Sequence, residues 1–376
     1  MEKYEPKFAL TVSKAVQAIS KLLLRRSGET ISGRVLLKLS PGALKVLSLQ
    51  KKVILVSGTN GKTSTSRVLY EQVSKLGPTT TSKSGSNLIY GAVNALMKDA
   101  KFAVLEIDEL HLPKVLEETK PAVVLLLNLS RDQLHRMHEV KKVAKRWHQA
   151  MNDVPETIFV IDVDDPFLNY ATMFAKNVIK VSFGGRKHPD GSVCPNCGKY
   201  LDWNEVIYSC VCGLSNSETD YKFQPGSAAY RNLTLANIAG GILNAPKANI
   251  DLKSLERSKI TIVSSRSVEL RLTKNPASWV EALNSVTGEN VIIILNARQV
   301  DGIDTSWLWD VSFIQLKGKN VVITGDRALD MAYRLHVQGI ESIAVEDFNS
   351  AAREFPEGSS IYALASYTAY FELVGK

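Results

Sequence analysis

One short segment constrains the fold of this chain more than any other. Apolar residues from Val53 to Val56 lead into Gly58-Thr59-Asn60-Gly61-Lys62-Thr63-Ser64, and a helical pattern starts near Lys62. A strand, a glycine-containing turn and a helix in this order let backbone N–H groups surround a phosphate at the positive end of the helix. Lys62 is then expected at the β- and γ-phosphates, and Thr63 is expected to offer its hydroxyl to Mg²⁺. The segment therefore predicts a nucleotide phosphate site.

The remaining hydrophobic pattern predicts an α/β fold with a mostly parallel sheet covered on both faces, because strand-like runs alternate with helical stretches. In the first half these runs cover residues 102–107, 122–128, 157–162 and 178–182. In the second half they cover residues 268–272, 291–295, 321–324, 342–344 and 360–364. We expect a basic helical N-terminal arm over residues 1–50, a central ATP-binding domain over 51–262 and a smaller C-terminal α/β domain over 263–376.

Composition excludes several classes of protein. The 376 residues are 45% hydrophobic and 22% charged, which is ordinary for a globular enzyme and unlike a collagen-like, disordered or disulfide-stapled chain. The longest unbroken apolar runs fall far short of the roughly 18–20 residues that a membrane-spanning helix needs. No secretory signal is visible, so a cytoplasmic location is expected.

The net charge of +8 is concentrated at one end of the chain. Residues 1–52 contain 11 Lys and Arg against three acidic residues, so the remaining chain is balanced at 35 against 35. Residues 8–26 and 33–48 look like two amphipathic helices joined at Ser27–Gly28, and the charge is either their solvated face or an approach surface for an anionic partner. No nucleic-acid reading module accompanies it, which favours phospholipid headgroups or a phosphorylated substrate over nucleic acid.

The four cysteines form two close pairs, Cys194 with Cys197 and Cys210 with Cys212. In a cytoplasmic protein this spacing predicts a tetrahedral Zn²⁺ site rather than disulfides. No open coordination position is apparent, so the zinc is expected to be structural. It would stabilise an insertion at about residues 190–216 that is too small to bury a core of its own.

The phosphate loop also resembles that of the Mur ligase superfamily, whose members use ATP to activate a carboxylate for amide formation. Further blocks with this resemblance are Leu105–Glu109, Asn128–Leu134, Ile161–Pro166, Leu235–Ala239 and Ser265-Arg266. The resemblance implies that Glu106 binds Mg²⁺. It also implies that Asn128, Asp162, Asp165 and Arg266 belong to the nucleotide site, together with Gly58, Thr59, Asn60, Gly61, Lys62, Thr63 and Ser64.

Some residues leave the superfamily pattern or allow a simpler interpretation. Taken singly, Glu106 and Asp108 could be ordinary polar ends of a strand, but ligands bind outside the carboxyl ends of parallel strands, which favours a site. Asp162 stands where the superfamily usually has an adenine-contacting asparagine, so recognition of the base stays open. The carbamylated lysine of many Mur ligases has no counterpart, because Lys145 lies two residues early and Trp147 falls on its position.

One branch of the superfamily carries a zinc ribbon, and this chain resembles it over nearly its whole length: the MurT-type subunits of lipid II isoglutaminyl synthase. The C-terminal blocks that carry the resemblance are Lys274–Ala277, Asp301–Asp310 and Thr324–Ala328. The resemblance implies ATP- and Mg²⁺-dependent amidation of the α-carboxylate of D-glutamate in a lipid-linked peptidoglycan precursor. The ammonia would come from a GatD-type glutaminase subunit in a heterodimer, and Asp304 would complete the catalytic triad of that partner.

Three alternatives stay open at this point. Asp301, Asp304 and Asp310 could simply cap turns. The chain could be a Mur or folylpolyglutamate-type ligase that adds an amino acid without a glutaminase. It could also be an ATP-binding scaffold without catalysis, although the intact Lys62, Thr63 and Glu106 argue against that interpretation.

Overall fold

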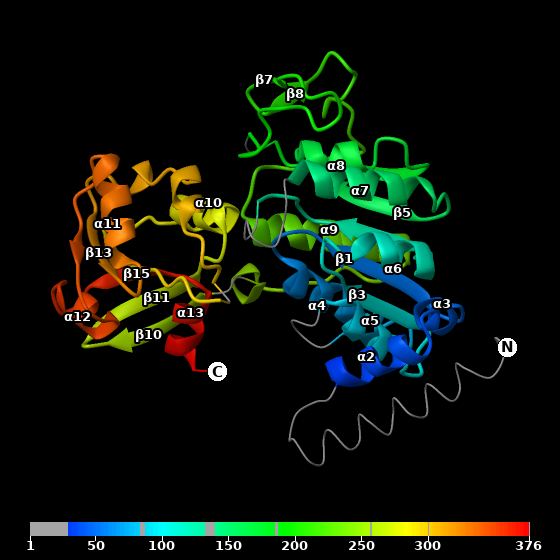
Figure 1. The fold of residues 1–376 in the computed structure, drawn as a ribbon, viewed down its shortest axis with the longest axis horizontal. Coiled ribbons are helices and arrows are strands. Elements are labelled where there is room, and N and C mark those ends of the chain that lie inside the picture. The colour runs from blue at the N-terminus through cyan, green and yellow to red at the C-terminus, as the bar shows by residue number, and fades with distance from the viewer. Residues whose placement is uncertain are drawn as a thin grey trace. The chain divides into compact units, whose positions relative to one another are not determined.

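The structure is a computed structural model that describes residues 29–82, 87–131, 140–184, 187–255, 258–299 and 301–375. The helix expected at residues 8–26 lies outside these ranges. The described residues form two compact units, which Figure 1 shows as ribbons. Unit 1 extends to Ser130 and from Val140 to Leu252, and unit 2 contains Arg131 and the residues from Lys253 onward.

Unit 1 is built on a parallel sheet with the strand order β2-β3-β1-β4-β5-β6-β9. Its strands are β1 (Lys52–Ser57), β2 (Thr79–Thr81), β3 (Phe102–Glu106), β4 (Val123–Leu126), β5 (Ile158–Asp162), β6 (Asn177–Ser182) and β9 (Tyr221–Lys222). The central strands are continuous apolar runs, as expected for strands that are buried on both faces. The predicted α/β architecture is confirmed.

Helices cover both faces of this sheet. They are α4 (Lys62–Val73), α5 (Ile89–Leu96), α6 (Leu112–Thr119), α7 (Val140–Asn152), α8 (Pro166–Ala171) and α9 (Ala228–Ile242). Helices α4 and α9 pack together on one face, while α6, α7 and α8 pack in a row on the other (Figure 1). The phosphate loop therefore joins a central strand to a helix that is fixed between the sheet and α9.

The described part of the basic N-terminal segment belongs to unit 1. It forms α2 (Glu29–Leu39) and α3 (Ala43–Ser48), which pack against α5 through buried side chains such as Leu36 and Leu44. The single helix expected over 33–48 is wrong, because Pro41 and Gly42 interrupt it. From residue 29 onward, the segment is thus part of the globular unit and not a separate arm.

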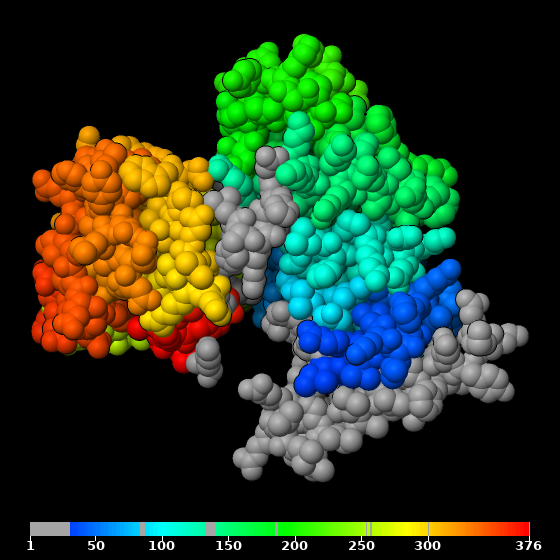
Figure 2. All heavy atoms as spheres, viewed as in Figure 1, coloured from blue at the N-terminus to red at the C-terminus, as the bar shows by residue number. Residues whose placement is uncertain are grey.

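The cysteine-containing insertion is a small lobe of unit 1. Its only regular structure among the described residues is the antiparallel pair β7 (Asp202–Asn204) and β8 (Ile207–Ser209). In the space-filling view of Figure 2 its residues, in green, stand out from the rest of unit 1. Strands of three residues cannot bury a substantial core, which agrees with a lobe that needs a metal.

Unit 2 is a second α/β layer structure with the strand order β10-β11-β15-β12-β13-β14. Its strands are β10 (Ser258–Val263), β11 (Arg266–Leu272), β12 (Asn290–Ile294), β13 (Asn320–Thr324), β14 (Ile343–Ala344) and β15 (Ser360–Ala365). Its helices are α10 (Pro276–Asn284), α11 (Ala328–Val337), α12 (Phe348–Arg353) and α13 (Tyr367–Val374), and short 3₁₀ turns are η1 (Leu252–Leu255), η2 (Ser306–Asp310) and η3 (Ile314–Leu316). Apolar clusters fill both faces of the sheet.

The structure places the start of unit 2 earlier than the boundary expected at 262/263. Strand β10 pairs along its length with β11, from Ser258 opposite Arg271 to Val263 opposite Arg266. A boundary at 262/263 would cut this hairpin, whereas one near Leu252 leaves both strands in one sheet. Within the described ranges, no helix is long and apolar enough to cross a membrane.

Candidate active site and metal centre

The loop after β1 has a conformation that two glycines make available. Gly58 and Gly61 have φ values of +137° and +87°, in the region that favours glycine. A Cβ atom on Gly58 would lie 2.8 Å from the carbonyl oxygen of Asn128, and one on Gly61 would lie 2.1 Å from Nδ2 of Asn232. Both positions therefore exclude side chains, and the backbone can approach a phosphate closely.

Asn128 holds this loop from the end of β4. Its side-chain Nδ2 donates to the carbonyl of Asn60 at 3.0 Å, and its Oδ1 accepts from the backbone N–H of Asn60 at 2.9 Å. Its carbonyl accepts from the N–H of Thr59, also at 2.9 Å. The structure thus places Asn128 as a support of the loop, and its predicted contact with the nucleotide would be indirect.

Lys62 is the first residue of α4, and its ammonium group is buried in the loop. Nζ donates to the carbonyl of Gly58 at 2.6 Å and lies 3.0 Å from Oε2 of Glu109. The Glu109 side chain is only 2% exposed, and burial raises the pKa of its carboxyl, with Lys62 acting in the opposite direction. Glu109 was not among the predicted site residues; the signal for it was a further acidic residue just after Asp108, on the same edge of the sheet.

Thr63 faces the predicted magnesium ligand. Its hydroxyl donates to Oε1 of Glu106 at 3.0 Å, and Glu106 ends strand β3 beside β1. A hydroxyl and a carboxylate at a phosphate loop are the hard oxygen ligands that Mg²⁺ prefers. The structure therefore brings Glu106 to Thr63, from which the sequence separates it by 43 residues. With Lys62 next to Thr63, the arrangement fits a magnesium–nucleotide site. Ser64 follows in the first turn of α4.

The two predicted aspartates after β5 have different surroundings. Asp165 caps α8 by accepting from Phe167 and also accepts from the N–H of Leu129 at 2.7 Å, so it ties β5 to the end of β4. Asp162 lies 3.9 Å from the guanidinium of Arg231 on α9. Burial and the neighbouring Asp164 raise the pKa of Asp162 to about 7, although Arg231 lowers it.

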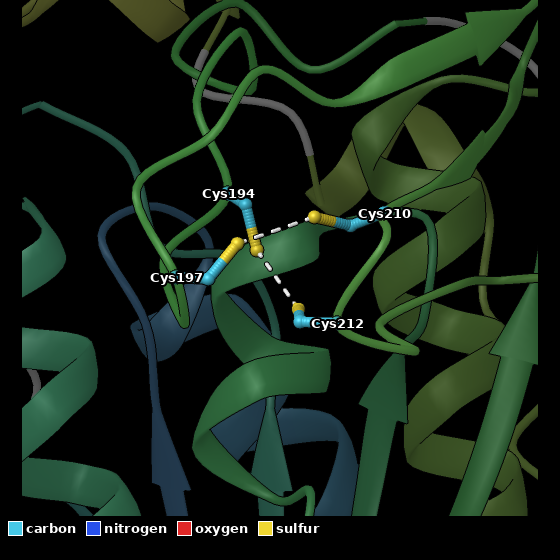
Figure 3. A group of neighbouring side chains, drawn as sticks. All are labelled: Cys194, Cys197, Cys210 and Cys212. Atoms are coloured by element: carbon cyan, nitrogen blue, oxygen red, sulfur yellow. Dashed lines mark hydrogen bonds between the residues drawn. The ribbon is translucent and has the colours of Figure 1, made fainter.

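The four cysteine sulfurs converge in the insertion. All four Sγ atoms lie within 4.8 Å of one another, with 3.6 Å between Cys194 and Cys212 and 3.4 Å between Cys197 and Cys210 (Figure 3). Zn–S bonds of about 2.3 Å place the sulfurs of a tetrahedral site about 3.8 Å apart. The cluster therefore fits one four-thiolate metal ion.

Side-chain hydrogen bonds fasten this insertion to the loop that follows β5. The Tyr208 hydroxyl donates to the carbonyl of Val163 at 3.0 Å, and Nδ2 of Asn169 donates to that hydroxyl at 2.8 Å. Nδ2 of Asn216 donates to Oδ1 of Asp164 at 3.0 Å. Neither Tyr208 nor Asn216 was among the predicted functional residues, because such long-range partners leave no local pattern in the sequence.

In unit 2 the three aspartates in or near η2 differ in their exposure to solvent and in their hydrogen-bond and ion-pair partners. Asp301 is buried and accepts from the N–H of Thr368 at 2.7 Å, and Asp310 pairs with Arg131 at 2.8 Å. Asp304 is exposed, and its Oδ1 accepts from the N–H of Ser306 at 2.8 Å. Asp304 therefore has an exposed carboxylate group, even though it also caps a turn.

Arg266 is buried at the start of β11. Its guanidinium donates to the carbonyls of Phe355 and Ser264 within unit 2. These bonds brace the tight turn between β10 and β11, in which Ser264 and Ser265 both have positive φ. They give Arg266 a structural role in its own unit, and its predicted contact with the nucleotide stays a prediction.

Two family models match the chain. The Mur ligase middle domain matches residues 56–205, and the MurT ligase C-terminal domain matches residues 272–370. The fold agrees: a pseudomurein peptide ligase type C from Methanothermus fervidus superposes with a TM-score of 0.62 at 15% identity, over 85% of this chain and 78% of that one. The chain thus has the Mur ligase fold and matches family models of two ligase domains.

Within that class, the chain is a homologue of the MurT subunits of lipid II isoglutaminyl synthase (glutamine-hydrolyzing). It is 26% identical to the subunit of Staphylococcus aureus strain N315, over 96% of this chain and 95% of that protein. It is 25% identical to the subunit of Streptococcus pneumoniae strain R6, over 92% and 91% of the two chains. The resemblance inferred from the sequence motifs is confirmed, and such a subunit implies a partner.

Proposed function

We propose that this protein uses ATP and Mg²⁺ to amidate the α-carboxylate of D-glutamate in lipid II. The observation that carries the proposal is the contact of Lys62 and Thr63 with carboxylates at and just after the end of β3, in a chain whose relatives are named as subunits of that synthase. A carboxylate oxygen would attack the γ-phosphorus, and ADP would leave. Ammonia would then attack the acyl carbon of the acyl phosphate, losing a proton as inorganic phosphate departs.

The loop residues have separate parts in this chemistry. Lys62 and the backbone N–H groups around Gly61 would hold the negative charge of the transferring phosphoryl group. Thr63 and Glu106 would hold Mg²⁺, which supplies further charge neutralisation when it is bound. The hydrogen bonds between the side-chain amide of Asn128 and the backbone of Asn60 would hold the loop in its conformation.

We also propose that the four cysteines hold one structural Zn²⁺. All four ligands are thiolates, which closes the coordination sphere and leaves no position for a substrate. The lobe would then support the loop after β5 through Tyr208 and Asn216.

The partner in the proposal is a GatD-type glutaminase that supplies ammonia in a heterodimer. Asp304 is the residue of this chain that would orient a histidine of that partner, because an aspartate fixes the tautomer of the ring and stabilises its charged form. Exposed apolar side chains on η2, on α11 and beside Asp304 support a docking surface here: Ile303, Trp309, Leu329, Tyr333 and Val337. Trp309 and Tyr333 pack edge to face, with 6.3 Å between ring centroids.

A lipid-linked substrate would place the protein at the inner face of the cytoplasmic membrane. The described basic residues Arg34, Lys38 and Lys45 are exposed on α2 and α3. Cationic residues near an anionic leaflet each contribute about 1 kcal/mol of attraction. We propose a peripheral contact of this kind, without a role in nucleic-acid binding.

The test is reconstitution of the purified protein with a glutaminase subunit, lipid II, ATP and Mg²⁺. Mass spectrometry of the product with either glutamine or ammonia as nitrogen source should show conversion of the acid to the amide. Addition of an amino acid without a glutaminase would instead indicate a peptide-forming Mur ligase. Failure to hydrolyse ATP under every condition would indicate a non-catalytic scaffold.

A further inference from the structure

The ion pair between Lys62 and Glu109 is unusual because both groups are almost completely buried. The side chains are 8% and 2% exposed, and the two charged atoms lie 3.0 Å apart. Nζ of Lys62 also donates to the carbonyl of Gly58 at 2.6 Å and lies 3.5 Å from that of Thr59. An ammonium group has three hydrogens, so these three acceptors already occupy it. A phosphate oxygen can gain a hydrogen bond from Lys62 only by displacing one of them.

Of these three acceptors, Glu109 is the one that a phosphate oxygen would most readily displace from Lys62. Its Oε2 faces Lys62, while Oε1 is buried and has no hydrogen-bond partner. Leaving one oxygen of a buried carboxylate unpaired is costly, so Lys62 is its main source of stabilisation. The backbone of Glu109 is fixed separately, because its carbonyl accepts from Nε1 of the buried Trp147 at 2.8 Å. The side chain can therefore lose its partner while its backbone stays in place.

We infer that Glu109 is a positioning residue that holds Lys62 in the phosphate loop and competes with the nucleotide for it. This inference rests on the proposed binding of ATP at the loop. The Glu109 carboxylate neutralises the buried Lys62 ammonium group when no phosphate is present. The anionic nucleotide must therefore break this ion pair before it can bind Lys62. The pair thus weakens nucleotide binding while it preserves the loop.

The direction of the effect separates this role from a merely structural one. Replacing Glu109 by glutamine removes the negative charge but keeps an oxygen that accepts from Lys62. If Glu109 competes with phosphate, E109Q should bind nucleotide about fivefold more tightly or better, the lower end of typical coupling between sites. If Glu109 only supports the fold, E109Q should bind nucleotide equally or more weakly.

The matched control is Glu118 on α6. It also pairs with a lysine, Lys114 at 3.8 Å, and also has a buried carboxylate oxygen without a partner. It lies in the last turn of α6, away from the phosphate loop in sequence, so E118Q should leave nucleotide affinity unchanged.

The experiment measures binding of ADP and of a non-hydrolysable ATP analogue with Mg²⁺ by calorimetry, for the full chain, E109Q, E118Q and K62A. Tighter binding by E109Q alone supports the inference, and unchanged or weaker binding by folded E109Q overturns it. If E109Q does not fold, E109D replaces it: its shorter carboxylate retreats from Lys62, and tightening of at least twofold is expected, whereas none overturns the inference. If the full chain binds no nucleotide, or K62A binds as well as the full chain, the proposed function itself fails.

Discussion

Lys62 and Thr63 are adjacent in sequence, and each faces a different carboxylate: Thr63 faces Glu106, the last residue of β3, and Lys62 faces Glu109, three residues later. This arrangement separates two tasks at the level of single residues. Glu106 and Thr63 offer oxygen ligands to a metal, while Lys62 offers charge to a phosphate. The strand, loop and helix predicted Lys62 and Thr63 because they leave a local pattern, and the family resemblance implied Glu106. The sequence did not predict Glu109, because an ion pair across 47 residues leaves no local pattern.

The first prediction concerns Lys62. Lys62→Ala should abolish carboxylate activation while the fold stays intact, because the backbone alone cannot supply the charge; loss of one such contact costs about 10²–10³ in rate. The measurement is ATP-dependent product formation, with circular dichroism as a check of folding. Lys75→Ala, at an exposed lysine just beyond the end of α4, is the control and should keep full activity. Near-normal turnover of Lys62→Ala would show that this loop is not the catalytic phosphate site.

Glu106 should respond differently because it acts through the metal. Glu106→Ala should lower the rate by a similar factor of about 10²–10³, and raised Mg²⁺ should restore part of it. A magnesium titration of both variants checks this expectation. Recovery of Lys62→Ala but not of Glu106→Ala at high Mg²⁺ would reverse the two assignments.

Asp162 leads to a prediction about pH. Its pKa is about 7 in the folded protein against 3.8 for the unperturbed group, because burial and Asp164 disfavour the charged form. The native state therefore binds more protons than the unfolded chain between these values, and the free energy of unfolding should fall as pH rises from about 4 to about 7. Asp162→Asn should remove this loss, which amounts to a few kcal/mol.

The measurement is urea unfolding at several pH values between 5 and 8. Asp153→Asn, at an exposed aspartate next to α7, is the control and should follow the parent protein. Parallel curves for Asp162→Asn and the parent would mean that Asp162 does not carry the pH dependence.

At the scale of elements, the sequence predicted the strands well and the breaks between elements poorly. Strands β1, β3 and β5 are short apolar runs that end in polar residues, and β4 is wholly apolar; these patterns are strong enough to place all four strands. The helix expected over 33–48 is two helices, because the turn at Pro41-Gly42 outweighs the amphipathic pattern on either side. The start of unit 2 was expected at residue 263, which is later than in the structure. The pairing of β10 with β11 cannot be recognised from the sequence of β10 alone.

The cysteine-containing lobe, at about residues 190–216, is the part of the molecule whose stability should depend most on one set of metal ligands. We expect about one Zn²⁺ per purified chain, because four converging thiolates couple metal binding to folding. Cys194→Ser should lower the free energy of unfolding by on the order of 3 kcal/mol. The affinity for ATP should change much less, since the phosphate loop is built from β1, β4 and α4.

Metal analysis and denaturant unfolding test this prediction, with chelator-treated parent protein before and after zinc is returned as the control. Protein purified without chelators that contains no zinc would end the idea. A loss of ATP affinity as large as the loss of stability would show that the lobe supports the nucleotide site directly, through Tyr208 and Asn216.

For the whole molecule, the proposed chemistry divides between the two units. The residues of the phosphate loop all belong to unit 1, whereas Asp304 and the exposed apolar side chains of η2 and α11 belong to unit 2. Activation of the carboxylate and production of ammonia should therefore be separable by mutation. A variant of unit 2 that disturbs only the partner would leave unit 1 able to use ammonia from solution.

The last prediction uses this separation. Asp304→Asn should suppress amidation with glutamine, by up to about 10⁴ if the wrong tautomer of the partner histidine results, and should leave amidation with added ammonia largely intact. Asp347→Asn is the matched control, because Asp347 is also an exposed cap in unit 2: it caps α12 by accepting from the N–H groups of Asn349 and Ser350. This substitution should change the rate of amidation with glutamine and with ammonia by the same factor. Equal loss of both activities in Asp304→Asn would assign that residue to the fold, and loss of neither would move the proposed role to Asp310, the exposed aspartate at the end of η2.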